Sequence, residues 1–268
     1  METTVGKIKV GTKLLFGQYG VSTDEILPIM WLKATPNGDF IAAKVLDYIC
    51  FDARERQSEY AQDRIIGNLD YGKSNIMLFL NTDDEDWWNP THESDEPPDR
   101  NNVCQAADAY HNHCGFLHHF EDYEIDSLVK KLLHTPGGAM ESLVRLPAYA
   151  DLVGGNRFKL FYKKGIRANG TDNYIYNRGL CRDFDSGSYI EFWLSDKNEF
   201  GTAILNRSGK MGYRAPFSSS GLRPVCTMNP DTVLEMDENG LCWVKQVGRQ
   251  VKLFTDNEFF ELLGVAQP

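Results

Sequence analysis

The 268-residue sequence contains no apolar run long enough to cross a membrane, no Cys-x-x-Cys pair and no cluster of lysine and arginine. The first twenty residues, METTVGKIKVGTKLLFGQYG, also lack the continuous apolar stretch of a signal peptide. The formal net charge is −10, which disfavours nucleic acid or an anionic membrane as the partner, because both require clustered positive charge. We therefore expect a protein that is made in the cytoplasm and binds neither.

The common catalytic signatures are also missing. The sequence has no G-x-S-x-G, no H-E-x-x-H and no cysteine and histidine at a recognisable catalytic spacing. Six cysteines are scattered along the chain, and at this chain length we expect reduced and mostly buried thiols. They stand at positions 50, 104, 114, 181, 226 and 242. The sequence thus predicts no catalytic constellation and no cofactor.

One segment fits the formula of a phosphate-binding loop: residues 67–74, GNLDYGKS. Its surroundings argue against that function, because only the short polar-led run RII precedes it where a buried strand is required. The loop interior also holds Asp70, which would repel a phosphate, and the bulky Tyr71. We predict instead a turn at Gly72 and a short helix, SNIMLFLN, capped by Ser74.

Two groups of residues could in principle hold a metal ion. Four histidines lie near two cysteines, but no pair has a known zinc-ligand spacing, so we expect ordinary histidines, with zinc as the alternative. These residues are His111, His113, His118, His119, Cys104 and Cys114. The acidic stretch 82–100 lacks the calcium-loop pattern, and we expect a solvated loop anchored by Trp87 and Trp88, with calcium as the alternative. The sequence predicts no metal.

The pattern of apolar runs and turn residues predicts an α+β protein with one domain over residues 1–250. The first fifty residues read as short strands, with a turn at 36–38. Residues 101–133 have a helical spacing of apolar side chains, in which Leu117, Ile125, Leu128 and Leu132 form one stripe, and Pro136-Gly137-Gly138 would end that helix.

Residues 143–233 predict a region rich in strands and turns. Its short alternating runs include RFKLFYKKG, NYIYNRG and SYIEFWLS, and residues 206–209 predict a hairpin loop. In the C-terminal tail, 251–268, Thr255 and Glu258 have the spacing of a capping box that opens a short amphipathic helix. We expect this helix to dock on the domain or on a neighbouring subunit.

Several stretches taken in order resemble a family of uncharacterised domains common in Firmicute genomes and their phages. They are LDYICFDARE, YGKSNIMLFLN, WWNPTH…PPD, CGFLHHFEDYE, LVRLPAYADLVGG and FWLSD…GTAILNRSGKMGY…SSSGLRPVCTMNPD. The resemblance covers roughly residues 8–235. It assigns GNLDYGKS to the family's Tyr-Gly-x-Ser-Asn helix start, which makes the phosphate-loop match a coincidence and leaves Lys73 at a variable position.

The resemblance implies a C-type-lectin-like fold, in the branch of formylglycine-generating-enzyme-like proteins, with short twisted antiparallel strands, two or three helices and long loops. The chain departs from relatives at 193–196, where Trp-Leu-Ser-Asp replaces Trp-Leu-Arg-Ser. The calcium and sugar motifs of true C-type lectins, Glu-Pro-Asn and Trp-Asn-Asp, are missing, and so are the paired cysteines of a formylglycine-generating site.

The function implied is that of a non-enzymatic phage virion component in the tail, baseplate or capsid decoration. Its partners would be other virion proteins and a host surface glycan or protein, and it would form a homo-oligomer within the particle. The alternative is an enzyme or degenerate enzyme of the formylglycine-generating type, or a cell-wall hydrolase accessory.

The expected recognition patch lies in the late strands and loops, where turns bring basic and aromatic side chains to the surface of an acidic protein. The patch comprises Lys197, Asn198, Arg207, Lys210, Tyr213 and Arg214. An anionic partner would suit it, such as a teichoic acid, an acidic glycan or an acidic protein face. We assign structural roles to Ser74 as a helix cap, to Trp193 in the core and to Arg223 as a strand anchor.

Overall fold

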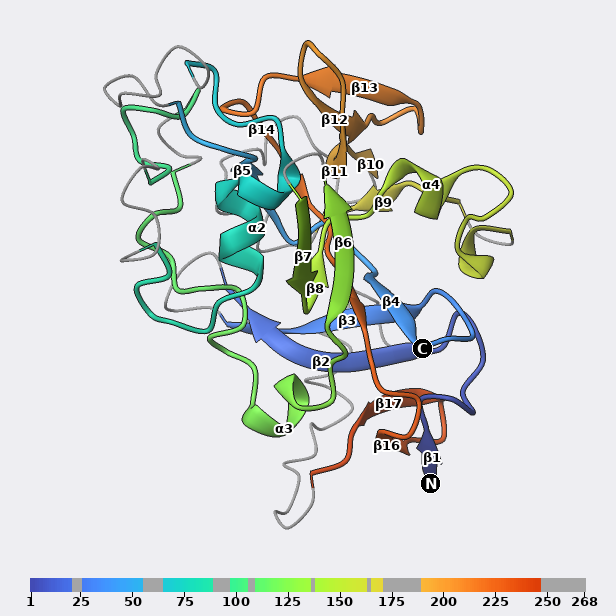
Figure 1. Cartoon of the computed structure of the whole chain (residues 1–268). Helices are drawn as coiled ribbons and strands as arrows, with labels where there is room; N and C mark the ends of the chain where they lie inside the picture. The colour runs from blue at the N-terminus through green and yellow to red at the C-terminus, as the bar shows by residue number, and fades with distance from the viewer. Residues whose placement is uncertain are drawn as a thin grey trace.

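The computed structural model has an α+β architecture in which short strands predominate, and the described residues include three α-helices of four to six residues (Figure 1). The structure describes residues 1–20, 26–54, 65–88, 97–105, 109–135, 138–162, 165–170 and 189–246. The helices are α2 (Asn75–Leu80), α3 (Asp122–Ile125) and α4 (Tyr149–Leu152), with 3-10 turns η1 (Tyr71–Lys73) and η3 (Lys159–Tyr162).

The larger sheet has eight strands in the order β1-β16-β17-β2-β3-β4-β15-β8 and occupies the lower half of Figure 1. All its neighbours are antiparallel except the pair β17 and β2. Its strands are β1 (Glu2–Thr4), β2 (Lys13–Tyr19), β3 (Leu27–Lys33), β4 (Asp39–Ala42), β8 (Val144–Arg145), β15 (Val225–Thr227), β16 (Val233–Met236) and β17 (Leu241–Val244). Strands from both ends of the described chain therefore build one sheet.

A five-stranded sheet lies above it, in the order β13-β12-β11-β14-β5. Its one parallel pair is β11 with β14, so the expectation of antiparallel strands holds for most but not all of the pairs. The strands are β5 (Asp47–Cys50), β11 (Phe192–Lys197), β12 (Thr202–Leu205), β13 (Met211–Arg214) and β14 (Ser219–Leu222). Two small antiparallel pairs complete the strands that the structure describes: β6 (Lys131–Thr135) with β7 (Gly138–Ser142), and β9 (Ala168–Asn169) with β10 (Tyr189–Ile190).

The predicted turns at 36–38 and 206–209 are confirmed. Gly38 joins β3 to β4 at φ +93°, and a β-carbon there would lie 2.6 Å from the carbonyl oxygen of Met228. Gly209 closes the β12–β13 hairpin at φ +81°, while the Asn206 side chain accepts a hydrogen bond from the backbone N–H of Lys210. Glycine is favoured at both positions because other residues rarely adopt this left-handed backbone.

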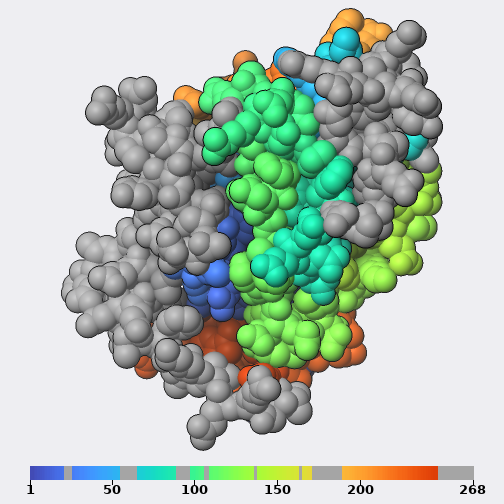
Figure 2. Space-filling view, turned by 90° about the vertical axis from the view of Figure 1, so that its left-hand side faces the viewer, coloured from blue at the N-terminus to red at the C-terminus, as the bar shows by residue number. Residues whose placement is uncertain are grey.

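Aromatic side chains build the core beside α2. Phe79 contacts the rings of Trp87 and Tyr110 edge-on at centroid distances of 5.4 and 5.2 Å, and those two rings stack on each other at 5.3 Å. Trp87 is buried, so it anchors the start of the acidic stretch as predicted. Figure 2 shows the side of the molecule that faces left in Figure 1, where teal and green atoms of the chain from α2 to α3 run down the face.

The prediction of one long helix over 101–133 is wrong. In the part of this stretch that the structure describes, only α3 is an α-helix, and the last residues belong to strand β6. The cause is non-local: β6 pairs with β7 in a hairpin, and Leu132, placed on the apolar stripe, is 58% exposed. The run RFKLFYKKG also differs, since its middle forms the 3-10 turn η3 rather than a strand.

Two other predictions concern stretches of the chain that the structure does not describe. The run NYIYNRG and the tail 251–268, with Thr255 and Glu258, lie outside the described residues. The single domain over 1–250 stays a prediction. None of the helices among the described residues has the length and apolar composition needed to span a membrane.

Candidate functional site

Residues 67–74 do not have the conformation of a phosphate loop. The residues immediately before them form a turn rather than a buried strand, and the helix that follows, α2, has only six residues. Asp70 uses its carboxylate to accept a hydrogen bond from the Gly72 N–H at 3.1 Å, the kind of backbone donor that a phosphate would need. Gly67 has φ +89°, and the Lys73 side chain is exposed.

Gly72 has a different role, because it makes room for the β6–β7 hairpin. A β-carbon at Gly72 would lie 2.8 Å from the Thr135 Oγ1 atom and 2.9 Å from the Met140 Sδ atom, closer than real β-carbons approach other atoms. The hairpin therefore rests directly on the turn η1. Met140 and Leu133 also pack against the main core cluster, which holds the hairpin in place.

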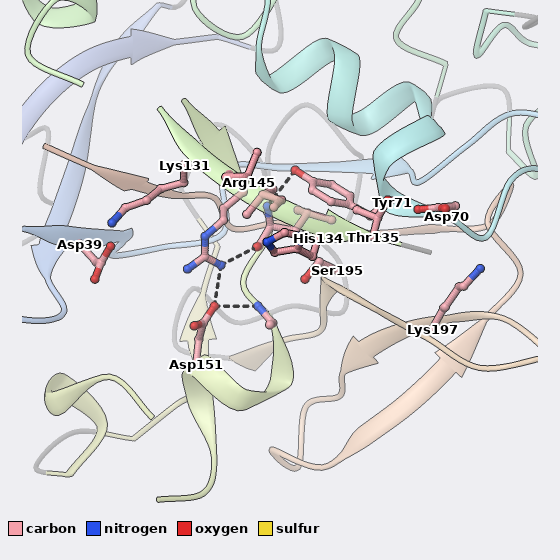
Figure 3. A pocket seen from close by; sticks show the side chains of 14 residues that line it. Asp39, Asp70, Tyr71, Lys131, His134, Thr135, Arg145, Asp151, Ser195 and Lys197 are labelled. Carbon is pink, nitrogen blue, oxygen red and sulfur yellow. Dashed lines mark hydrogen bonds and ion pairs between the residues drawn. The ribbon is translucent and has the colours of Figure 1, made fainter. Parts of the chain in front are cut away.

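A cleft of about 400 Å³ opens where this hairpin meets η1, the β8–α4 connection and the end of β11 (Figure 3). Its lining is mixed in polarity and comes from segments that are far apart in the sequence. The lining residues are Asp39, Asp70, Tyr71, Lys131, Leu132, Leu133, His134, Thr135, Arg145, Leu146, Ala148, Asp151, Ser195 and Lys197. We call this space the hairpin cleft.

One wall of the hairpin cleft is a continuous hydrogen-bonded chain. The backbone N–H of Leu146 donates to the Tyr71 hydroxyl at 3.1 Å, and the Leu146 carbonyl accepts from Arg145 Nη1 at 3.1 Å. Arg145 Nη1 also pairs with Asp151 Oδ2 at 2.6 Å, and the same oxygen accepts from the Ala148 N–H. Burial raises the pKa of the Tyr71 phenol far above its usual value, so this group stays protonated.

All three carboxylates in the cleft already have partners within the chain. Asp39 accepts hydrogen bonds from the hydroxyls of Thr35 and Thr227, at 2.6 and 2.7 Å. Asp70 caps η1, and Asp151 holds Arg145. These acids are therefore fixed in position by local structure.

The cleft also contains cations that no carboxylate neutralises directly. Within the described residues, Lys131 and Lys197 have no ion-pair partner within 4 Å, and the His134 side chain lines the same space. The two lysines come from both sides of the space, since Lys131 lies on β6 and Lys197 ends β11. Lys131, Arg145 and Lys197 balance the three carboxylates of the cleft, so its lining is neutral on a chain of net charge −10 and repels a negatively charged ligand less than an acidic surface would.

The structure separates the six residues of the predicted recognition patch into two groups. Lys197 pairs with Thr202 at one end of β12, whereas Met211, which follows Lys210, pairs with Leu205 at the other end. Three residue steps along a strand span about 10 Å, so these two ends are distinct parts of the surface.

Two of the patch residues at the Lys197 end already make contacts within the chain. The Asn198 side-chain oxygen accepts from the backbone N–H groups of Phe200 and Gly201, both at 2.9 Å, and so closes the β11–β12 turn. Arg214 pairs with Glu191 at 2.6 Å. Lys197 is the only member of the patch that lines the hairpin cleft.

Tyr213 completes this group and is 42% exposed, on the edge strand β13. At the opposite end, Arg207 and Lys210 flank Gly209, which lies against Arg167: a β-carbon at Gly209 would be 3.6 Å from Arg167 Cγ. The Arg167 guanidinium in turn stacks over the Tyr189 ring at 3.9 Å. A second basic and aromatic surface therefore exists, away from the cleft.

Arg223 is almost fully buried. Its Nε atom donates to the Ala42 carbonyl at 3.0 Å and its Nη1 atom to the Ile166 carbonyl at 2.7 Å. The guanidinium carbon also lies 5.1 Å from the centre of the Phe192 ring and 5.8 Å from that of Phe161. Burial lowers the pKa of Arg223 to about 9, so the group remains charged at neutral pH. These contacts tie three separate segments together around one side chain.

Trp193 is fully buried, and its indole N–H donates to the Ile49 carbonyl at 2.8 Å. Ser74 is the N-cap of α2, where its Oγ atom accepts from the Met77 N–H. The alternation in YIEFWL and the cap position in the sequence predicted both placements.

The histidine and cysteine cluster does not come together as a ligand set. Within the part of the chain that the structure describes, no group of three or more His, Cys, Asp or Glu side chains is placed to hold a metal ion. His118 Nδ1 lies 2.8 Å from the Asp83 carbonyl oxygen, and its ring meets that of His119 edge-on at 4.8 Å. Burial and the neighbouring His118 lower the pKa of His119.

Sequence reasoning missed most of the hairpin cleft. Tyr71, Arg145 and Asp151 stand in the stretches YGKSNIMLFLN and LVRLPAYADLVGG, which carry the family resemblance and could have drawn attention to them. Lys131 had no such signal, because its position depends on the unpredicted hairpin. In comparisons with known proteins, no family model, no curated protein and no solved structure matches this chain.

Proposed function

We propose that this chain is a non-enzymatic recognition module that binds an anionic partner in the hairpin cleft. The observation that carries the proposal is the pair of lysines without an ion-pair partner, Lys131 and Lys197, around a concave space whose carboxylates all have intrachain partners. A ligand that brings negative charge could pair with these two lysines without displacing an existing ion pair.

The chemical class of ligand we propose is an anionic polymer of a cell surface, such as a teichoic acid or an acidic glycan, or an acidic face of a neighbouring protein. The second basic surface, near Arg207 and Lys210, could hold another part of an extended ligand. Contacts at two separated sites on one polymer raise the overall affinity by raising the effective concentration at the second site.

The resemblance in sequence supports a more specific proposal: a C-type-lectin-like domain that serves as a phage virion component in the tail, baseplate or capsid decoration. Other virion proteins and further copies of the chain would then be partners within the particle. Mass spectrometry of purified particles tests this placement directly, and particles that lack the chain would refute it without bearing on anion binding.

The binding proposal is tested by titrating the protein with polyglycerol phosphate and, separately, with polygalacturonate over a series of salt concentrations. We expect affinity to fall as salt rises, and the double variant Lys131→Ala, Lys197→Ala to lose at least about tenfold in affinity at low salt. The matched control is Lys7→Ala, Lys9→Ala, which removes two exposed lysines outside the cleft and should leave affinity unchanged. Failure of the wild-type protein to bind either polymer would refute the proposal.

A further inference from the structure

Arg145 is placed more rigidly than any other cation in the hairpin cleft. It lies on β8, an edge strand of the eight-stranded sheet, opposite Val225 of β15. Its side chain is only 16% exposed. Strand pairing also fixes the backbone of Lys131 on β6 and Lys197 on β11, so Arg145 differs from them in how its side chain is held.

The guanidinium itself is anchored at one nitrogen. Nη1 carries two hydrogens and makes two contacts, one to the Leu146 carbonyl at 3.1 Å and one to Asp151 Oδ2 at 2.6 Å. Asp151 is held in turn by the Ala148 N–H at 2.8 Å, and the Leu146 peptide by the Tyr71 hydroxyl. Because the guanidinium is planar, fixing Nη1 between two acceptors also fixes the direction of its other N–H groups.

The remaining donors of Arg145 are free. Among the described residues, Nε and Nη2 have no hydrogen-bond acceptor, although the side chain is mostly removed from solvent. In Figure 3, Arg145 lies in the middle of the lining side chains, with Lys131 and Asp39 to one side in this view. The Asp39 carboxylate, which accepts hydrogen bonds from the hydroxyls of Thr35 and Thr227, would repel an anion bound beside Arg145, whereas Lys131 would attract it.

We propose that the free Nε–Nη2 edge of Arg145 is the specificity-determining contact of the hairpin cleft and that it binds a carboxylate or phosphate group in a two-pronged arrangement. This inference rests on the proposed function. Two parallel N–H donors match two oxygens of a carboxylate or phosphate, whereas a chloride ion has no such pair of acceptors. Asp151 neutralises the charge of Arg145, so the role of Arg145 is to orient the bound anion. Lys131 and Lys197 supply the long-range attraction.

The two roles predict different responses to substitution. Arg145→Lys keeps the positive charge but removes the fork, so it should lower affinity for both polymers about tenfold and leave the salt dependence unchanged. Lys131→Ala should instead flatten the salt dependence. A second variant, Asp151→Asn, frees Arg145 from its anchor, so it should steepen the salt dependence while lowering selectivity between anions.

The decisive experiment is competition against polyglycerol phosphate by inorganic phosphate, acetate and chloride at equal ionic strength, with unfolding curves to confirm that each variant is folded. For the wild-type protein we expect phosphate and acetate to compete at least about tenfold better than chloride, and for Arg145→Lys we expect this difference to vanish. Polygalacturonate as the second polymer shows whether carboxylate or phosphate is preferred.

The outcomes separate this inference from the proposed function. If the wild-type protein binds neither polymer, the proposed function fails. If it binds in a salt-dependent manner but chloride competes as well as phosphate and acetate, or both Arg145→Lys and Asp151→Asn retain the wild-type selectivity, then the assignment to Arg145 is wrong while anion binding stands.

Discussion

Gly72 and Thr135 lie so close together that a single β-carbon on Gly72 would come 2.8 Å from the Thr135 Oγ1 atom. The glycine that completes the apparent phosphate-loop formula is therefore favoured by packing between η1 and the β6–β7 hairpin. The same hairpin forms one side of the hairpin cleft, so this contact links the stability of the fold to the shape of the candidate site.

Replacing Gly72 by alanine should lower the free energy of unfolding by about 1–3 kcal/mol, because overpacking forces the hairpin to shift. Denaturant unfolding measures this change. The control is Gly155→Ala, since a β-carbon there meets no atom within 4 Å and the backbone angle is ordinary. Equal stability of the two variants would show that the hairpin yields without cost. We also expect Gly72→Ala to weaken polyglycerol phosphate binding, because Lys131 and His134 move with the hairpin.

Substitution of Arg223 by alanine should lower the free energy of unfolding by roughly 3 kcal/mol, because it leaves a cavity and removes the donor to the buried Ala42 carbonyl and to the partly buried Ile166 carbonyl. Thermal and denaturant unfolding test this. Arg100→Ala serves as the control, since Arg100 is exposed, and it should change stability little. A variant Arg223→Ala with an unchanged melting temperature but no polymer binding would contradict the structural role.

Glu124 predicts a pH dependence of stability. Its carboxylate accepts hydrogen bonds from the backbone N–H groups of Gly17 and Glu121, but burial dominates and raises its pKa above the ordinary 4.5. The folded state therefore binds the proton more tightly than the unfolded state. The contribution of Glu124 to stability is present below the unfolded-state pKa and is lost as pH rises through the higher folded-state pKa.

The variant Glu124→Gln should remove this part of the pH profile. At each pH, the unfolding free energy of Glu124→Gln is subtracted from that of the wild-type protein. This difference should decrease as pH rises above about 4.5. The matched control is Glu238→Gln, at an exposed position. A flat difference for Glu124→Gln would mean that burial does not control this carboxyl.

Ser74→Ala should cost about 1 kcal/mol, because it removes the side chain that caps α2 and also donates to the Tyr71 carbonyl at 2.8 Å. Ser74→Thr keeps the hydroxyl and should recover most of that loss. If both variants unfold at the same denaturant concentration as the wild-type protein, then the cap contributes nothing measurable.

Features that depend on a few neighbouring residues could be read from the sequence. The turns at Gly38 and Gly209 need a positive φ that glycine readily adopts, and the cap at Ser74 needs only a hydroxyl before an apolar run. The burial of Trp193 follows from the apolar run around it, since Phe192 and Leu194 are buried as well.

Features that depend on distant segments could not be read in this way. Residues 131–133 end the stretch with a helical spacing, but pairing of residues 131–135 with residues 138–142 makes them a strand. The hairpin cleft needs that strand, the turn η1, the residues after β8 and the end of β11 in one place. Only the complete topology brings Lys131 near Arg145, because no local pattern encodes their separation.

The strand order also has a consequence for how the protein is made. Strands β2, β4 and β5 emerge early from the ribosome, yet their partners β17, β15 and β14 all follow residue 218. At typical rates of translation, the edges of the first strands stay unpaired for on the order of ten seconds before those partners have been synthesised. Exposed strand edges pair readily with other chains. The nascent protein should therefore depend on chaperones during synthesis and should fold mainly after its last strand has been made.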